Sequence, residues 1–149
     1  MIHTRRTEGR RAFVAALASC LLVAAAAAEE AIPAGDLARG PVARELEGGL
    51  VVSFEILPRP IEAMKELVFA VTLTREGKPV EGAGLSLALS MPAMYMGRNS
   101  PTLTEVKPGR FEGRGVVPRC MSGDKRWQAT ILVKEAGASF SVVFPFETS

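Results

Sequence analysis

The sequence predicts an all-β domain, an immunoglobulin-like antiparallel β-sandwich of about seven strands. Apolar and polar residues alternate with a period of two in successive segments from residue 50 onward, which is typical of strands that bury one face. Glycine and proline separate these segments, and no amphipathic helical pattern lies between them. Short strands with regular turns favour two packed antiparallel sheets, each with its outer face exposed to solvent.

The expected strands follow one another as alternating runs bounded by turn residues. Their ranges are 50–56, 67–73, 85–89, 102–106, 110–117, 127–133 and 140–146. Lys107-Pro108-Gly109 predicts a tight turn between the fourth and fifth strands. We expect Trp127 and the three late phenylalanines to dominate the core, because burying each such aromatic contributes about 2–3 kcal/mol.

Residues 1–28 have the layout of a signal peptide. A basic stretch with four arginines precedes an apolar run from Ala12 to Ala28, whose small residues supply a cleavage site. An uncleaved leader that anchors the chain in a membrane, and a lipidated Cys20 in Leu17-Ala18-Ser19-Cys20, are alternatives that we rank below cleavage. Arg10-Arg11-Ala12-Phe13-Val14 also resembles a twin-arginine export signal. All of these routes predict a periplasmic or otherwise exported domain.

Residues 29–46 show no sustained period. We expect a tether there, with a helical turn near residues 42–46, followed by the sandwich domain over residues 47–149. The leader holds four of the 18 basic residues and one of the 16 acidic residues, which leaves 14 and 15. No run of lysine or arginine remains, so neither nucleic acid nor an anionic membrane is an expected partner.

Soft sulfur ligands are concentrated in two short segments. Residues 91–96 carry three methionines, and Cys120-Met121 carries the only cysteine outside the leader. The one histidine, His3, lies in the leader. Thioether and thiolate ligands favour Cu(I), whereas blue-copper sites need two histidines and zinc sites draw on histidine and several cysteines or carboxylates. Cu(I) is therefore the candidate cofactor, and the lack of a histidine base argues against an enzyme.

The loops of such a sandwich alternate between two ends, because successive strands run in opposite directions. Loops 58–65, 91–101 and 118–125 are expected to share one end, and they hold every methionine and the only cysteine after the leader. Ordinary packing is the competing interpretation, since methionine fills irregular gaps in cores. Met91 continues the alternating phase of the strand before it, and Met64 can pack under its own loop.

Cys120 has no partner cysteine if Cys20 leaves with the leader. An odd cysteine in an exported protein indicates a metal ligand, an intermolecular disulfide or a reactive thiol. A small buried hydrophobe is the competing interpretation, because free cysteine is among the most buried residue types, and the residues alone leave both interpretations open. Arg119, Lys125 and Arg126 lie nearby in the sequence, and we expect their positive charge to lower the pKa of the thiol.

Four short motifs follow one another along the chain. They are Gly77-Lys78-Pro79-Val80-Glu81-Gly82-Ala83, Met91-Pro92-Ala93-Met94 with Met96-Gly97, Pro108-Gly109-Arg110-Phe111, and Met121-Ser122-Gly123-Asp124 followed by Trp127. In these motifs the chain resembles the YtkA-like family, to which the FixH-type accessory proteins of respiratory oxidase assembly are related. The resemblance covers residues 50–147. It implies an exported β-sandwich with a role in copper handling or membrane-oxidase maturation. FixH-like proteins retain an N-terminal membrane helix, whereas the leader here looks cleavable.

The leading prediction is an exported, non-enzymatic domain that binds Cu(I) as a metallochaperone does. The expected metal ligands are Met91, Met94, Met96, Cys120 and Met121. The alternative is an immunoglobulin-like interaction module without a metal, in which Met94, Tyr95 and Met96 form an apolar docking knob. The expected partner is a membrane or periplasmic protein, and no small-molecule substrate is evident.

Overall fold

The computed structural model describes residues 36–149. The predicted leader, its alternative export routes and the first part of the predicted tether lie outside these residues. Within residues 36–149 no helix is long and apolar enough to cross a membrane. The elements follow in the order α1 (Asp36–Arg39), β1 (Val42–Leu46), a 3-10 turn (Glu47–Gly49), β2 (Leu50–Leu57), β3 (Glu66–Arg75), β4 (Lys78–Pro79), β5 (Gly84–Ser90), β6 (Thr104–Lys107), β7 (Arg110–Val116), β8 (Arg126–Glu135) and β9 (Ala138–Glu147).

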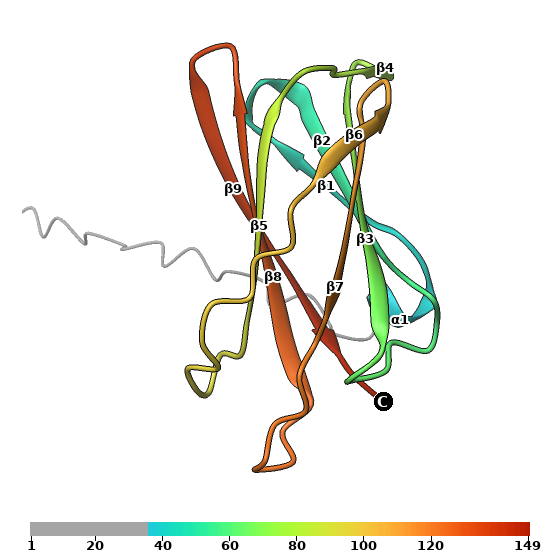
Figure 1. Ribbon diagram of the computed structural model, residues 1–149. Helices are drawn as coiled ribbons and strands as arrows, with labels where there is room; N and C mark the ends of the chain where they lie inside the picture. Colours follow the sequence, from blue (N-terminus) through green and yellow to red (C-terminus); the bar gives the residue numbers. More distant parts are fainter. Residues whose placement is uncertain (1–35) are drawn as a thin grey trace, which may run out of the picture. The chain divides into compact units, whose positions relative to one another are not determined.

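The strands form two antiparallel sheets packed face to face (Figure 1). The larger sheet has the order β1-β2-β3-β7-β6, with β4 paired to the end of β3, and the smaller sheet has the order β5-β8-β9. If β1 and β4 are set aside, four strands and three strands in this order are the arrangement of a constant-type immunoglobulin domain. The predicted fold class is confirmed, with β1 and β4 as two strands beyond the expected set.

The core lies between the sheets and is built from the inward positions of the alternating strands. Trp127, Phe144 and Phe146 are at most 1% exposed, as the sequence predicts. Phe140, the first of the late phenylalanines, is only partly buried. The ring of Phe54 in the larger sheet lies 5.3 Å from the ring of Phe144 in the smaller sheet, measured between centroids. An aromatic contact thus joins the two sheets at the centre of the domain.

Residues 42–46 correct the sequence interpretation, because they form strand β1 and not a helical turn within a tether. β1 pairs with β2 as a tight hairpin. Gly48 and Gly49 turn the chain with φ values of 72° and 70°, which glycine adopts without steric cost. The guanidinium of Arg44 lies 5.6 Å from the centroid of the Phe144 ring, a favourable cation–π arrangement. The charged residues of β1 conceal its alternation in the sequence.

The short helix α1 also belongs to the folded domain. Leu37 is 1% exposed and joins the core cluster, and its carbonyl oxygen accepts a hydrogen bond of 3.3 Å from Nε of Arg59. The domain therefore begins before the boundary that the sequence predicts at residue 47.

Three loops meet at one end of the sandwich, as the alternation of strand direction predicts (Figure 1). We call this end the sulfur end; it comprises residues 58–65, 91–103 and 117–125. The backbone N–H of Met64 donates to the carbonyl oxygen of Val117 at 2.8 Å, which joins the first loop to the third. The chain ends here too, because the N–H groups of Thr148 and Ser149 donate to the carbonyl oxygens of Lys125 and Ile61.

Candidate functional site

The sulfur end brings a thiol and a thioether into contact. Sγ of Cys120 lies 3.5 Å from Sδ of Met94, and the thiol donates to the thioether. Cys120 belongs to the loop between β7 and β8, whereas Met94 belongs to the loop between β5 and β6. Cys120 is 4% exposed and Met94 is 43% exposed. The pair is thus covered on the side of Cys120 and open to solvent on the side of Met94.

A hydrogen-bonded turn holds the cysteine in place. The N–H of Gly123 donates to the carbonyl oxygen of Cys120 at 3.1 Å, and the φ of Gly123 is 80°, a left-handed value that favours glycine. This turn brings the hydroxyl of Ser122 to 2.9 Å from Sγ of Cys120. The sulfur therefore has two polar contacts, one to an oxygen and one to a second sulfur.

These contacts lower the pKa of the Cys120 thiol below its ordinary value. The largest cause is the hydrogen bond from the Ser122 hydroxyl, and the backbone N–H groups of Ser122 and Asp124 add to it, against burial and the Asp124 carboxylate. The sequence predicts a lowered thiol pKa, which is correct, but it attributes the shift to nearby cations. The structure attributes it to hydrogen bonds. Arg126 instead pairs with Asp124 at 2.9 Å and helps to hold the pKa of that carboxyl at about 2.

The other predicted ligands lie in different surroundings. Met91 is 5% exposed and belongs to the core cluster, as the packing interpretation predicts. Met96 is partly buried and packs against the same core. Met121 is fully exposed, and Met64 at the same end is 62% exposed. The structure thus brings Met94 into contact with Cys120, uses Met91 and Met96 in packing, and leaves Met121 in solvent.

Asn99 fixes the path of the loop that carries Met94. Its carbonyl oxygen accepts a hydrogen bond of 2.8 Å from the N–H of Leu89 in β5. Its side-chain amide donates to the carbonyl oxygen of Val116 at the end of β7, at 2.9 Å. The loop is therefore tied to both sheets on either side of the sulfur pair. The sequence did not predict the role of Asn99 in fixing this loop or the contact of Ser122 with the thiol. The Ser122-Gly123 pair, which is typical of a turn, was the only sequence signal for the Ser122 contact.

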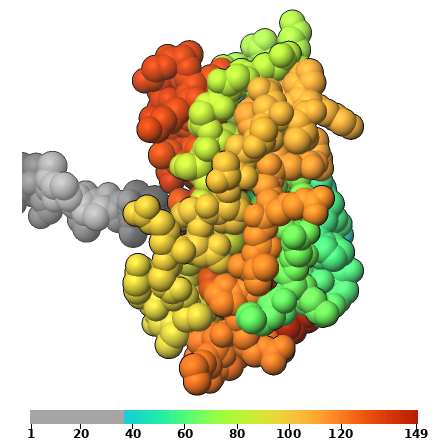
Figure 2. All heavy atoms as spheres, in the orientation of Figure 1, coloured from blue at the N-terminus to red at the C-terminus, as the bar shows by residue number. Residues whose placement is uncertain are grey.

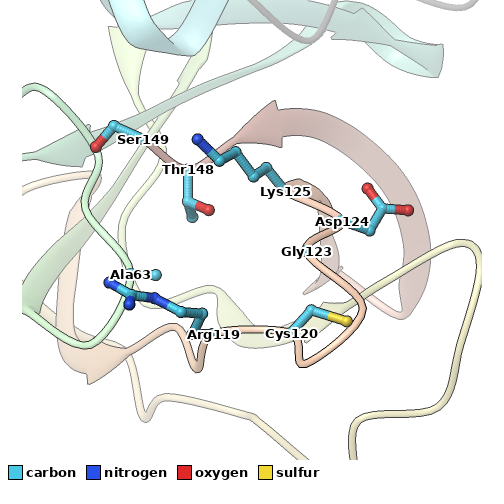
Figure 3. A pocket seen from close by; sticks show the side chains of 8 residues that line it. All are labelled: Ala63, Arg119, Cys120, Gly123, Asp124, Lys125, Thr148 and Ser149. Atoms are coloured by element: carbon cyan, nitrogen blue, oxygen red, sulfur yellow. The ribbon is translucent and has the colours of Figure 1, made fainter.

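A hollow of about 380 Å³ lies beside the cysteine, between the third loop and the end of the chain (Figure 3). Arg119, Lys125 and Thr148 contribute to its lining, together with Cys120. Figure 3 shows the Cys120 sulfur turned away from the middle of this hollow. The thiol therefore faces the Met94 loop and not the hollow, so the hollow is not a pocket that presents the thiol to a substrate.

No cluster of hard metal ligands competes with the sulfur pair in the described part of the chain. Among residues 36–149 there is no group of three or more His, Cys, Asp or Glu side chains that could hold a metal ion. A structural zinc site needs about four such ligands. The donor set at the sulfur end is therefore soft, with one thiol and one thioether in contact.

Comparison with known proteins supports the fold alone. No family model matches the chain, and no curated protein matches it. Among solved structures, the chain is similar to a DUF4785 family protein from Legionella pneumophila, with 16% sequence identity and a TM-score of 0.55. The similarity covers 69% of this chain and 29% of that chain, so the chain spans less than a third of that protein's length. The resemblance to the YtkA-like family stays a prediction.

Proposed function

We propose that the protein is an exported, non-enzymatic domain that binds Cu(I) through the Cys120 thiolate and the Met94 thioether. The observation that carries this proposal is the separation of 3.5 Å between the two sulfur atoms. Metal–sulfur bonds are about 2.3 Å long, so both sulfurs can reach one ion. Thiolate and thioether sulfur are the ligands that select Cu(I) among biological metals.

The protonation chemistry of the site favours metal binding. A cysteine must lose its proton to act as a ligand. The hydrogen bonds that lower the pKa of Cys120 therefore increase the fraction of thiolate near neutral pH. The Ser122 hydroxyl, 2.9 Å from Sγ, stabilises that thiolate and would orient it toward Met94.

The openness of the site fits transfer of an ion better than permanent storage. Met94 is 43% exposed, so a partner's ligands can approach from its side. Met121 follows Cys120 directly and is fully exposed, so it is free to supply a third sulfur. Met91 and Met96 support the loop by packing on the core. The resemblance to the YtkA-like family agrees with such a role in copper handling or in the maturation of a respiratory oxidase.

A competition titration tests the proposal. The reduced protein is titrated with Cu(I) under anaerobic conditions against a coloured Cu(I) chelator. We expect Cys120→Ser and Met94→Leu each to weaken the competition at least tenfold. Met64→Leu is the matched control, since Met64 lies at the same end and is 62% exposed without being part of the pair. Equal competition by the wild type and the two site variants would refute Cu(I) binding at this site.

The interaction module without a metal is the second candidate, and one observation favours it. The Tyr95 side chain is 89% exposed next to the exposed Met94, and aromatic residues are enriched at protein interfaces. Under this function, a chelator would leave capture of a membrane partner unchanged and Tyr95→Ala would abolish it. Capture that survives Tyr95→Ala would count against the docking knob.

A further inference from the structure

Large apolar side chains project from all three loops of the sulfur end. Met64, Met94, Tyr95 and Met121 are 62%, 43%, 89% and 104% exposed, and they are four of the seven large hydrophobic residues that are exposed in the described part of the chain. The Met64–Val117 hydrogen bond and the sulfur contact hold the three loops side by side, and Figure 2 shows them together at the lower end of the molecule. The exposed apolar surface is therefore concentrated at one end.

The same loops carry an excess of positive charge. Residues 58–65, 91–103 and 117–125 contain five basic and two acidic side chains, whereas the turns and loops of the opposite end, residues 47–49, 76–83, 108–109 and 136–137, contain one basic and three acidic side chains. Within residues 36–149, four of the five cations at the sulfur end form no ion pair with a described acidic residue; they are Lys65, Arg98, Arg119 and Lys125. All four are exposed.

We propose that the sulfur end docks on the surface of an anionic lipid bilayer, with the loop tips at headgroup depth and the cations on lipid phosphates. Charge complementarity identifies an anionic occupant, because basic side chains beside a membrane are attracted by acidic lipids. Tyrosine favours the bilayer interface, since its ring is apolar and its hydroxyl remains wet. Long basic side chains place their charge on headgroups while their stems stay in apolar surroundings.

The shape of the apolar surface favours lipid over a protein. The four side chains stand on three separate loops and not on a continuous sheet face, and their exposed fractions rise to complete exposure at Met121. Such side chains enter the interface of a bilayer one by one, whereas a specific protein interface requires a closely packed core patch. The docking proposal does not rest on Cu(I) binding, and its test leaves Cys120 and Met94 unchanged.

Vesicle sedimentation tests the proposal with protein in its exported form, whose N-terminus is read by mass spectrometry. The vesicles contain phosphatidylcholine alone or with phosphatidylglycerol. We expect binding to the anionic vesicles that high salt weakens. We expect the double variant Arg119→Glu/Lys125→Glu to lose at least tenfold in affinity, and Met64→Ser/Tyr95→Ser to lose a similar factor.

The matched control lies at the other end of the sandwich. Val106 is 51% exposed, Lys107 is exposed beside it, and the double variant Val106→Ser/Lys107→Glu changes one apolar and one basic side chain there. We expect this variant to bind within twofold of the wild type. All variants share one N-terminus, so a leader or lipid that remained would affect them equally. The proposal is overturned if the control and the sulfur-end variants bind alike, or if the wild type does not bind anionic vesicles.

A fluorescence experiment tests the depth of the loop tip directly. The chain has one tryptophan, Trp127, and one tyrosine, Tyr95, and Trp127 is 1% exposed in the core. Tyr95→Trp therefore adds an exposed indole at the loop tip, whose emission is measured against that of the buried Trp127. We expect lipids brominated near the headgroup to quench the added emission but to leave that of the wild type unchanged. Emission in the variant that does not respond to the brominated vesicles would contradict insertion of this loop.

Discussion

The hydroxyl oxygen of Ser122 lies 2.9 Å from the sulfur of Cys120, two residues earlier in the chain. The turn closed by the Gly123 N–H and the Cys120 carbonyl oxygen produces this contact between two residues that are close in the sequence. Met94 reaches the same sulfur from another loop. A local contact thus sets the protonation of the thiol, while a long-range contact supplies the second soft ligand.

Ser122→Ala is expected to raise the pKa of Cys120. The Ser122 hydroxyl is the largest cause of the lowered pKa, and removing a donor to a thiolate disfavours the charged form. The ultraviolet absorbance of the thiolate, recorded as a function of pH, measures the shift without requiring access for a reagent. A Cys120→Ser variant supplies the baseline from any other thiol.

Ser100→Ala is the control for this titration, because Ser100 is an exposed serine at the same end. We expect the Ser100→Ala midpoint to match that of the wild type, with the Ser122→Ala midpoint at higher pH. Coincident midpoints in all three proteins would show that the hydroxyl does not stabilise the thiolate.

Asp124→Asn is expected to remove a stabilising contribution that depends on pH. Arg126 helps to lower the pKa of Asp124 from 3.8 to about 2, and a carboxyl whose pKa is lower in the folded state stabilises that state above its unfolded pKa. The contribution is therefore complete above pH 3.8 and is lost as the pH falls through about 2. Thermal unfolding of both proteins across this range measures it, and a gap between them that stays constant down to pH 2 would contradict the ion pair.

Apart from β6, whose residues are all exposed, the strands that sequence analysis predicted have apolar residues at their inward positions. β2 is an example, since Leu50, Val52, Phe54 and Ile56 are fully buried and alternate with half-buried residues. β1 was missed because Arg44 occupies one of its alternating positions and rests on the Phe144 ring. The arginine fits at this position because its guanidinium rests on an aromatic ring about 100 residues later in the chain. The sequence pattern of residues 42–46 alone cannot reveal that contact.

The candidate site was predictable at the level of loops but not of side chains. The alternation of strand direction placed Met94 and Cys120 at one end, which the structure confirms. The alternating phase of the preceding strand predicts that Met91 packs on the core. No such pattern separates Met96, which also packs on the core, from Met94, which contacts the thiol. That difference depends on the path of the loop, and the hydrogen bonds of Asn99 to both neighbouring strands fix this path.

Gly113→Ala is expected to destabilise the domain, whereas Gly84→Ala is not. A Cβ at Gly113 would overlap the carbonyl oxygen of Thr102 and approach Cδ2 of Leu103 at 3.1 Å, and such overpacking costs about 1–3 kcal/mol. A Cβ at Gly84 would meet Cβ of Lys134 at 3.5 Å, an ordinary contact. Replacing such a glycine stabilises by about 0.4–1 kcal/mol, because the unfolded chain loses freedom. Urea unfolding of both variants measures the difference, and equal midpoints would refute close packing around Gly113.

Phe144→Ala is expected to cost about 3–5 kcal/mol of the free energy of unfolding, as large-to-small substitutions of a buried phenylalanine do. Phe144 is fully buried, lies 5.3 Å from Phe54 across the sandwich and carries Arg44 on its ring. The substitution therefore loosens the contact between the sheets and the attachment of β1 together. Val143→Ala, at the next position in the same strand and 43% exposed, is the control and should change stability by less than about 0.5 kcal/mol. Similar urea midpoints for the two variants would show that the sheets do not depend on this ring, and hydrogen exchange of the β1 amides in Phe144→Ala would report whether β1 opens with it.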